Sequence, residues 1–135
     1  MWRFKAILSA LLTGLVYVLG GFDVSLKALT LLIVMDIVTG LLKGIYQKNL
    51  DSETGFKGII KKVLLFALVA VAHAIDTITG QSGVIRTLII YYIAANEGLS
   101  ILENMGAMGV NIPTFLKDKL TQLKEGGTNG SEESN

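Results

Sequence analysis

The hydrophobic positions of this chain are gathered in long runs, and its charged positions lie mainly between them. Each run has about the length that crosses a bilayer whose hydrocarbon core is about 30 Å thick. The pattern predicts four short membrane-spanning helices, over residues 5–22, 25–46, 62–79 and 84–104. We therefore expect an all-α fold, an integral membrane helical bundle with residues 1–105 as its transmembrane domain.

Beyond residue 105 the pattern changes. Pro113 ends a turn over residues 106–113, because proline cannot continue a helix. Residues 114–124 then alternate apolar and charged positions as a short amphipathic helix does, which predicts a helix on the membrane surface or on the bundle. Residues 126–135 contain no apolar side chain, so we expect a disordered polar tail.

The positive charges indicate the topology. A basic connector between the second and third predicted spans carries five lysines and is expected to be a cytoplasmic loop, since lysine-rich loops resist translocation. The N-terminal and C-terminal segments are basic as well, and four spans with both termini in the cytoplasm place all three regions on one side. Three spans with one interfacial helix are the alternative. The connector lysines are Lys43, Lys48, Lys57, Lys61 and Lys62.

Composition supports the membrane class and argues against several functions. Charged residues make up 17% of the chain, against about 25% in soluble domains. A net charge of +1 argues against a nucleic-acid partner. The absence of cysteine and the single histidine exclude thiolate and multi-histidine metal sites. No catalytic motif is present, so we expect neither an enzyme nor a cofactor.

Several polar side chains interrupt the predicted spans. Asp36 lies near the middle of the second span and Asp76 near the end of the third, where a carboxylate in hydrocarbon costs about 2.5–3.5 kcal/mol. Asp76 is expected to pair with Arg86 across the turn at residues 80–83, and a contact of His73 with Asp76 is read as packing rather than a proton relay. One polar face of the fourth span suits a bundle interior, a water-lined surface or a self-association contact; it comprises Arg86, Asn96, Glu97, Ser100, Glu103 and Asn104.

Small residues recur at four-residue spacing on two of the spans. Ala10 and Gly14 share one face of the first, and Gly40 and Gly44 share the face of the second that carries Asp36. Such spacing lets two helix backbones approach closely in lipid. The spacing leaves open whether the partner helix belongs to the same chain or to a second copy.

Four stretches together resemble a known family. They are MDIVTG at Met35–Gly40, SETGFKGIIKK at Ser52–Lys62, AIDTITG at Ala74–Gly80, and the long segment Arg86–Pro113 with its NEGLSILEN and GVNIP pieces. In this order they resemble the phage holin family that includes the toxin-secretion holins of clostridia. The resemblance covers about residues 5–124.

The resemblance implies a small helical protein of the bacterial cytoplasmic membrane without enzymatic activity. Such a protein accumulates in the lipid bilayer and then abruptly forms a homo-oligomer, which opens timed lesions that collapse the membrane potential and release an endolysin or a toxin. The endolysin is a functional partner that passes through the lesion. Two alternatives stay open: a small dimeric ion or small-molecule transporter, and a non-conducting antiholin or adaptor.

Overall fold

The computed structural model describes residues 1–133, with side chains through residue 126, and within that range the chain is all-α. The predicted fold class is therefore confirmed. The helices are α1 (Trp2–Val18), α2 (Val24–Tyr46), α3 (Ser52–Thr79), α4 (Val84–Ala107) and α5 (Thr114–Glu133).

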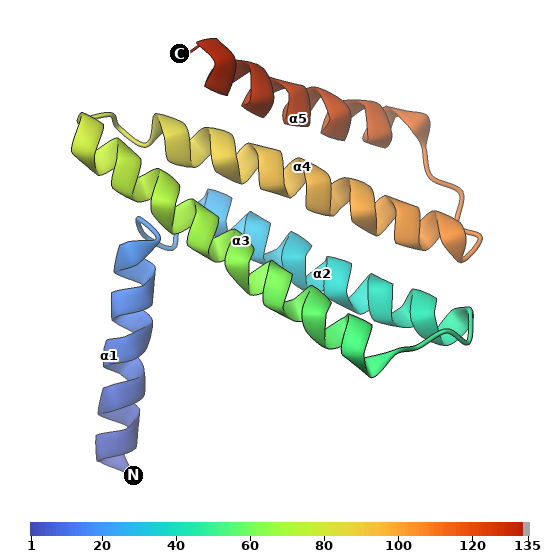
Figure 1. Cartoon of the computed structure of the whole chain (residues 1–135), viewed down its shortest axis with the longest axis horizontal. Coiled ribbons are helices and arrows are strands. Elements are labelled where there is room, and N and C mark those ends of the chain that lie inside the picture. Colours follow the sequence, from blue (N-terminus) through green and yellow to red (C-terminus); the bar gives the residue numbers. More distant parts are fainter. Residues whose placement is uncertain (134–135) are drawn as a thin grey trace.

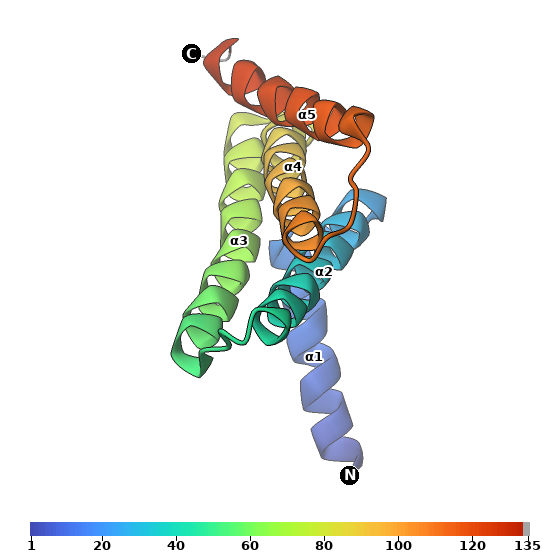
Figure 2. The same cartoon turned by 90° about the vertical axis from the view of Figure 1, so that its right-hand side faces the viewer.

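Helix α4 is the centre of the arrangement. It packs against α2 and α3 on one side and against α5 on the other, while α1 projects away from the bundle (Figures 1 and 2). The apolar core fills the space between α2, α3 and α4 and extends to the end of α1. Its buried members are Leu19, Leu26, Leu29, Ile33, Val69, Ile90 and Ile93.

Three of the helices, α2, α3 and α4, are long and apolar enough to cross a membrane. They correspond to the second, third and fourth predicted spans. Helix α1 has 17 residues, and within residues 1–126, whose side chains the structure describes, none of its side chains is buried and nothing lies within 4 Å of a Cβ placed at Gly14. A membrane crossing by α1 therefore stays a prediction, as does the close-packing role of Ala10 and Gly14.

Helix α3 begins at Ser52 rather than at residue 62, so the connector is shorter than the sequence pattern predicts. Asp51 starts the helix, because its Oδ1 accepts a hydrogen bond from the Glu53 backbone nitrogen and its Oδ2 accepts one from the Thr54 hydroxyl. Lys57, Lys61 and Lys62 are therefore helical, which corrects the expectation that they belong to a loop. With 28 residues, α3 is about 42 Å long, so it exceeds a hydrocarbon core of about 30 Å.

Helix α5 lies antiparallel to α4 and packs closely on it (Figure 1). A Cβ at Gly98 would lie 2.9 Å from one methyl of Leu120, and the Lys124 ammonium lies 5.9 Å from the centre of the Tyr92 ring. The helix continues to Glu133, so residues 126–133 are helical where the polar composition predicts disorder. Backbone hydrogen bonding continues there from the amphipathic turns before it, which composition alone does not reveal. Residues 134–135 lie outside the described residues.

Candidate functional site

The site begins with three charged side chains that α2, α3 and α4 bring to one point inside the bundle. The ammonium of Lys62 donates to Asp36 Oδ2 at 2.5 Å and to Glu97 Oε1 at 2.8 Å. The two carboxylate side chains are each 6% exposed, and the Lys62 side chain is 23% exposed. One lysine therefore holds two buried carboxylates that come from different helices.

The three charges lie within the spans rather than at their ends. Helices α2 and α4 begin at the same end of the bundle, and at 1.5 Å per residue Asp36 lies about 18 Å and Glu97 about 20 Å from these starts. Lys62 lies about 26 Å from the end of α3 at that same side. Its long aliphatic stem carries the ammonium inward to the carboxylates. The charges thus meet at a depth where lipid solvates none of them.

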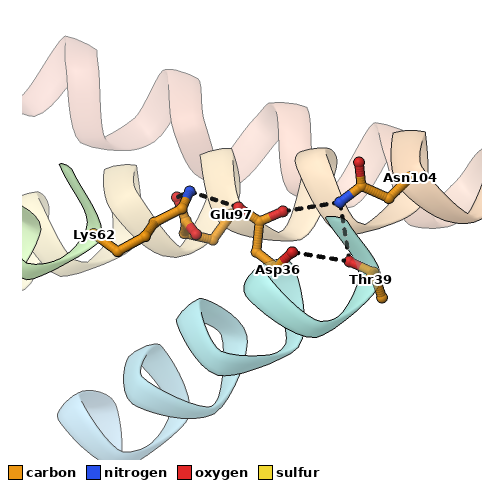
Figure 3. Close-up of polar contacts among 5 residues, drawn as sticks. All are labelled: Asp36, Thr39, Lys62, Glu97 and Asn104. Carbon is orange, nitrogen blue, oxygen red and sulfur yellow. Dashed lines mark hydrogen bonds and ion pairs between the residues drawn. The ribbon is translucent and has the colours of Figure 1, made fainter. Parts of the chain in front are cut away.

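Polar neighbours on α2 and α4 extend the cluster (Figure 3). The Asn104 amide nitrogen donates to Asp36 Oδ1 at 3.2 Å and to the Thr39 hydroxyl oxygen at 3.0 Å. The Thr39 hydroxyl in turn donates to the Asp36 backbone oxygen at 3.2 Å. Both oxygens of the Asp36 carboxylate are therefore bonded, one to Lys62 on α3 and the other to Asn104 on α4.

Glu97 is satisfied on one side only. Its Oε1 accepts from Lys62, whereas its Oε2 is buried and has no hydrogen-bond partner among the described residues. Buried polar atoms without a partner are rare in folded proteins, because each loses its hydration without replacement. Asp36 and Glu97 share the one ammonium of Lys62, so the three groups carry more negative than positive charge when all are ionised.

A cavity of about 500 Å³ connects the cluster to the end of the bundle where α2 meets α3. Asp36, Lys62, Ser100 and Asn104 line its inner part. The connector and four glycines also line the cavity: Gly40, Gly44, Gly55 and Gly58. The cavity gives the charged side chains a route to water from this end.

A second polar cluster lies at the opposite end of the bundle, beside a second cavity of about 420 Å³. Arg86 Nη1 donates to Asp23 Oδ2 at 2.8 Å, and its Nε and Nη2 donate to the backbone oxygens of Leu19 and Gly21 at 2.7 and 3.0 Å. The hydrogen bond from Arg86 holds the pKa of the Asp23 carboxyl below its ordinary value. Gly20 has φ +87°, and a Cβ there would lie 2.7 Å from His73 Nδ1. The loop between α1 and α2 therefore fits tightly against α3 and α4.

Asp76 supports the same end, but with another partner than the sequence predicts. Its two carboxylate oxygens accept from the backbone nitrogens of Ile85 and Arg86, both at 2.9 Å. These are orphan donors of the first turn of α4, so Asp76 caps that helix from α3. The predicted ion pair with the Arg86 side chain is wrong in its partner, since within the described residues the guanidinium pairs with Asp23.

The sequence model of one family matches nearly the whole chain. The bacteriophage holin family model aligns with residues 13–125. This chain belongs to the bacteriophage holin family. Holins are not an enzyme family, and the three apolar helices together with the family identify a membrane protein.

Relatives of this family member are found in phage and in Gram-positive bacteria. A protein of Bacillus phage phi105 named "Probable holin" is 41% identical over 95 residues, which is 70% of each chain. An uncharacterised protein of Listeria monocytogenes is 44% identical over 102 residues, 76% of this chain and 73% of the relative. An uncharacterised 14.9 kDa protein of Clostridium perfringens is 42% identical over 108 residues, 79% and 82% of the two chains. No solved structure matches this holin-family chain.

The six residues of the predicted polar face of the fourth span lie in different surroundings in the structure. Glu97 and Asn104 are buried in the central cluster, and Ser100 lines the cavity beside it. Arg86 is buried at the opposite end of the bundle. Asn96 is uncharged and half-buried, and Glu103 is charged but exposed, so neither adds a charge to the cluster. The role of the whole face in an oligomer or a lesion stays a prediction.

Both glycines of the second span face neighbours in the same chain. A Cβ at Gly40 would lie 3.7 Å from the Asn104 amide nitrogen, and one at Gly44 would lie 3.2 Å from a Leu50 methyl. Within the described residues, the close approach at these two positions is therefore intramolecular.

Sequence reasoning missed three of the site residues. Lys62 is read as a loop lysine, and Thr39 and Asp23 receive no role. Asp23 carries a recognisable signal, since an aspartate directly before an apolar helix is a common N-cap, and its Oδ1 accepts from the Leu26 backbone nitrogen at 3.0 Å. Lys62 and Thr39 carry no comparable local signal. The partners of Lys62 lie on α2 and α4, and the side-chain partner of Thr39 is Asn104 on α4.

Proposed function

We propose that this protein acts as a holin of the bacterial cytoplasmic membrane. It oligomerises there and forms timed lesions, which collapse the membrane potential and release a cytoplasmic endolysin. It has no enzymatic activity of its own in this role. The observation that carries the proposal is the Asp36–Lys62–Glu97 cluster, which lies buried inside the spans of a holin-family chain.

The cluster suits a protein with a closed and an open arrangement. Within one bundle, Lys62 and Asn104 supply partners for the carboxylates, so α2, α3 and α4 can remain in lipid without exposing charge. In an assembly of many copies, water can take over these hydrogen bonds along a lumen. The same side chains then line an aqueous lesion, and only their partners change.

Helix α5 supports a contact between copies. Lys117, Asp118 and Lys119 are exposed on its outer face while the helix lies along α4. Each such charge in hydrocarbon would cost about 2.5–3.5 kcal/mol, so α5 cannot keep this position with lipid around it. We propose that α5 leaves α4 for the membrane surface, where amphipathic helices lie. The face of α4 around Gly98 then becomes available to a helix of another copy.

Helix α1 is the other surface in need of a partner. It is apolar, and none of its residues is buried within the chain. Lipid or a neighbouring copy must cover it, and the face with Ala10 and Gly14 allows close approach of another helix.

The charges also favour one orientation. Lys43, Lys48, Lys57 and Lys61 lie at the end of the bundle where α2 meets α3, which the positive-inside rule places in the cytoplasm. The cavity beside the cluster opens toward the same side. The α1–α2 loop and the α3–α4 turn then lie outside, and the N-terminus is cytoplasmic when α1 also crosses. Membrane potential can bias such an assembly, since one charge moved across 100 mV is worth about 2.3 kcal/mol.

Induced expression in a bacterium with a cytoplasmic endolysin tests the proposal. Culture density and membrane potential are followed together, with and without the endolysin. We expect sudden depolarisation with this protein alone and abrupt lysis when both proteins are present. Depolarisation without passage of the folded endolysin would indicate a small-molecule or ion transporter, and a culture that keeps both its potential and its density would indicate a non-conducting adaptor.

A further inference from the structure

The charges in the central cluster do not balance. Asp36 and Glu97 contribute two carboxylates, and Lys62 is the one cation that contacts them in the part of the chain that the structure describes. Helix α5 reaches α4 at Gly98 through the apolar side chain of Leu120. Helix α1 contacts only α3, among the described residues. With all three groups ionised, one negative charge would stay uncompensated among largely buried side chains inside the bundle.

The two carboxylates differ in how they are satisfied. Asp36 accepts from Lys62 on one oxygen and from Asn104 on the other, so it is equipped to stay ionised. Glu97 accepts from Lys62 on Oε1 only, and Oε2 is buried without a partner. A buried carboxylate with one oxygen unsatisfied takes up a proton rather than remain charged. The proton also turns Oε2 from an unsatisfied acceptor into a donor.

We propose that Glu97 is a proton-binding site that is occupied while the bundle is closed. In this state Asp36 is negative, Lys62 is positive and Glu97 is neutral, so the cluster carries no net charge. When the proton leaves Glu97 for water in the cavity, the cluster gains one negative charge and the contact of α4 with α2 and α3 is weakened.

A proton fits this place better than a metal ion. The described residues contain no group of three or more acidic or histidine side chains that could hold one. Cations such as Ca²⁺ take 6–8 oxygen ligands, whereas here the ammonium of Lys62 already occupies the space between the carboxylates. Glu97 is not among the residues that line the cavity, so its proton reaches the cavity past Lys62, which contacts Glu97 and lines the cavity together with Asp36 and Asp51.

Infrared spectroscopy of the purified full-length protein in lipid tests the assignment. Wild-type protein at pH 7 is expected to show the carbonyl stretch of a neutral carboxylic acid. Glu97→Gln should lose this band, because glutamine keeps the shape of the neutral acid but carries no carboxyl group. Glu53→Gln is the matched control and should keep the band, since Glu53 is 78% exposed and pairs with Lys57 on its own helix.

Three results would overturn the assignment. Wild-type protein could lack the band, the band could survive Glu97→Gln and disappear in Asp36→Asn, or replacing sodium by choline could change it. The first result needs no variant, so the test does not depend on whether a variant folds. Circular dichroism of each variant confirms that its helices are intact.

A second variant tests the route to the proton. A Cβ at Gly58 would meet no side chain within 4 Å among the described residues, and Gly58 lines the cavity, so we expect the larger side chain of Gly58→Leu to narrow the cavity. Exchange of the Glu97 proton for deuterium should become slower, while the band itself remains. Unchanged exchange would contradict the cavity as the route.

The consequence in cells rests on the proposed function. With Glu97→Gln the cluster cannot gain its negative charge, so lysis should start later than with wild-type protein or with Glu53→Gln. Equal onset with wild type and Glu97→Gln would contradict a role of the proton in opening. If wild-type protein itself does not lyse cells, the proposed function fails, whereas the infrared result still decides whether Glu97 binds a proton.

Discussion

Arg86 on α4 and Asp23 at the start of α2 form an ion pair although 63 positions separate them in the sequence, with Arg86 Nη1 at 2.8 Å from Asp23 Oδ2. The same guanidinium donates to the carbonyl oxygens of Leu19 and Gly21, so it fixes the whole loop that follows α1. Together with the Asp76 carboxylate, which caps α4 from α3, this guanidinium joins the helices at one end of the bundle.

The first prediction concerns the hydrogen bonds that the Arg86 guanidinium donates. Arg86→Lys keeps the charge, but an ammonium cannot reach two carbonyl oxygens and a carboxylate together. We expect the free energy of unfolding to fall by about 1.5–3 kcal/mol, the range for hydrogen bonds to charged groups. Unfolding in mixed micelles, followed by circular dichroism, measures the change. Arg3→Lys on the exposed helix α1 is the control and should leave the midpoint in place.

The second prediction concerns pH and Asp23. The hydrogen bond from Arg86 lowers the pKa of this carboxyl below its ordinary value of 3.8, so the ionised form stabilises the folded protein. This contribution is complete above the ordinary pKa and is lost as pH falls through the lowered one. Asp23→Asn keeps a capping side chain and removes the charge. Because Asp23 is 51% exposed, we expect a loss of less than about 1 kcal/mol at pH 7.

The gap in unfolding free energy between wild type and Asp23→Asn should close as pH falls below 3.8. Unfolding curves at several pH values from neutral to acidic measure it. A gap that stays constant to the lowest pH at which the bundle is folded would contradict the role given to the ion pair.

The sequence predicts the helices well because their signal is local. Apolar runs of membrane length indicate α2, α3 and α4 regardless of what they pack against. The start of α3 is missed for the opposite reason. A lysine-rich stretch is read as a loop, yet Asp51 caps a helix there, and the charges of Lys57 and Lys61 simply remain exposed on it.

The site is predicted only in part, because its partners are distant in the sequence. Asp36 and Glu97 are recognisable as charges inside spans, but their shared cation lies 26 and 35 positions away from them on α3. The sequence correctly predicts that Asp76 lies near Arg86, but it does not predict which group Asp76 binds there. Its carboxylate satisfies backbone nitrogens at the start of α4 rather than the guanidinium. Which donor wins depends on the turn geometry, which residue types do not encode.

The third prediction tests whether α5 must leave α4. The chain has no cysteine, and a Cβ at Gly98 would lie 3.5 Å from Leu120 Cγ. Sulfurs at these two positions are close enough for a disulfide. We expect Gly98→Cys with Leu120→Cys to form an intramolecular disulfide that prevents lysis under oxidising conditions, since the face of α4 around residue 98 stays covered.

Addition of a reductant should restore lysis in the double-cysteine protein within the same culture. Each single-cysteine variant is a control that cannot form the intramolecular bond, and its lysis should not respond to the oxidant. Non-reducing electrophoresis reports the fraction that is cross-linked. Lysis at normal onset by a fully cross-linked protein would show that α5 can stay on α4.

The fourth prediction concerns Lys62 as the cation of the central cluster. Lys62→Met keeps the length of the stem and removes the charge, which leaves the buried carboxylate of Asp36 without its cation. Breaking a buried ion pair in this way costs about 3–5 kcal/mol. We expect a loss of this size in the free energy of unfolding, and adding Asp36→Asn to the same chain should restore most of it, because no unpaired charge then remains when Glu97 carries the proton proposed above. Unfolding in mixed micelles of the two single variants and the double variant gives the coupling between the two positions.

Lys61→Met, next in sequence and exposed, is the control and should change little. If the two losses simply add, Lys62 and Asp36 do not depend on each other, and the cluster does not hold α2 against α3.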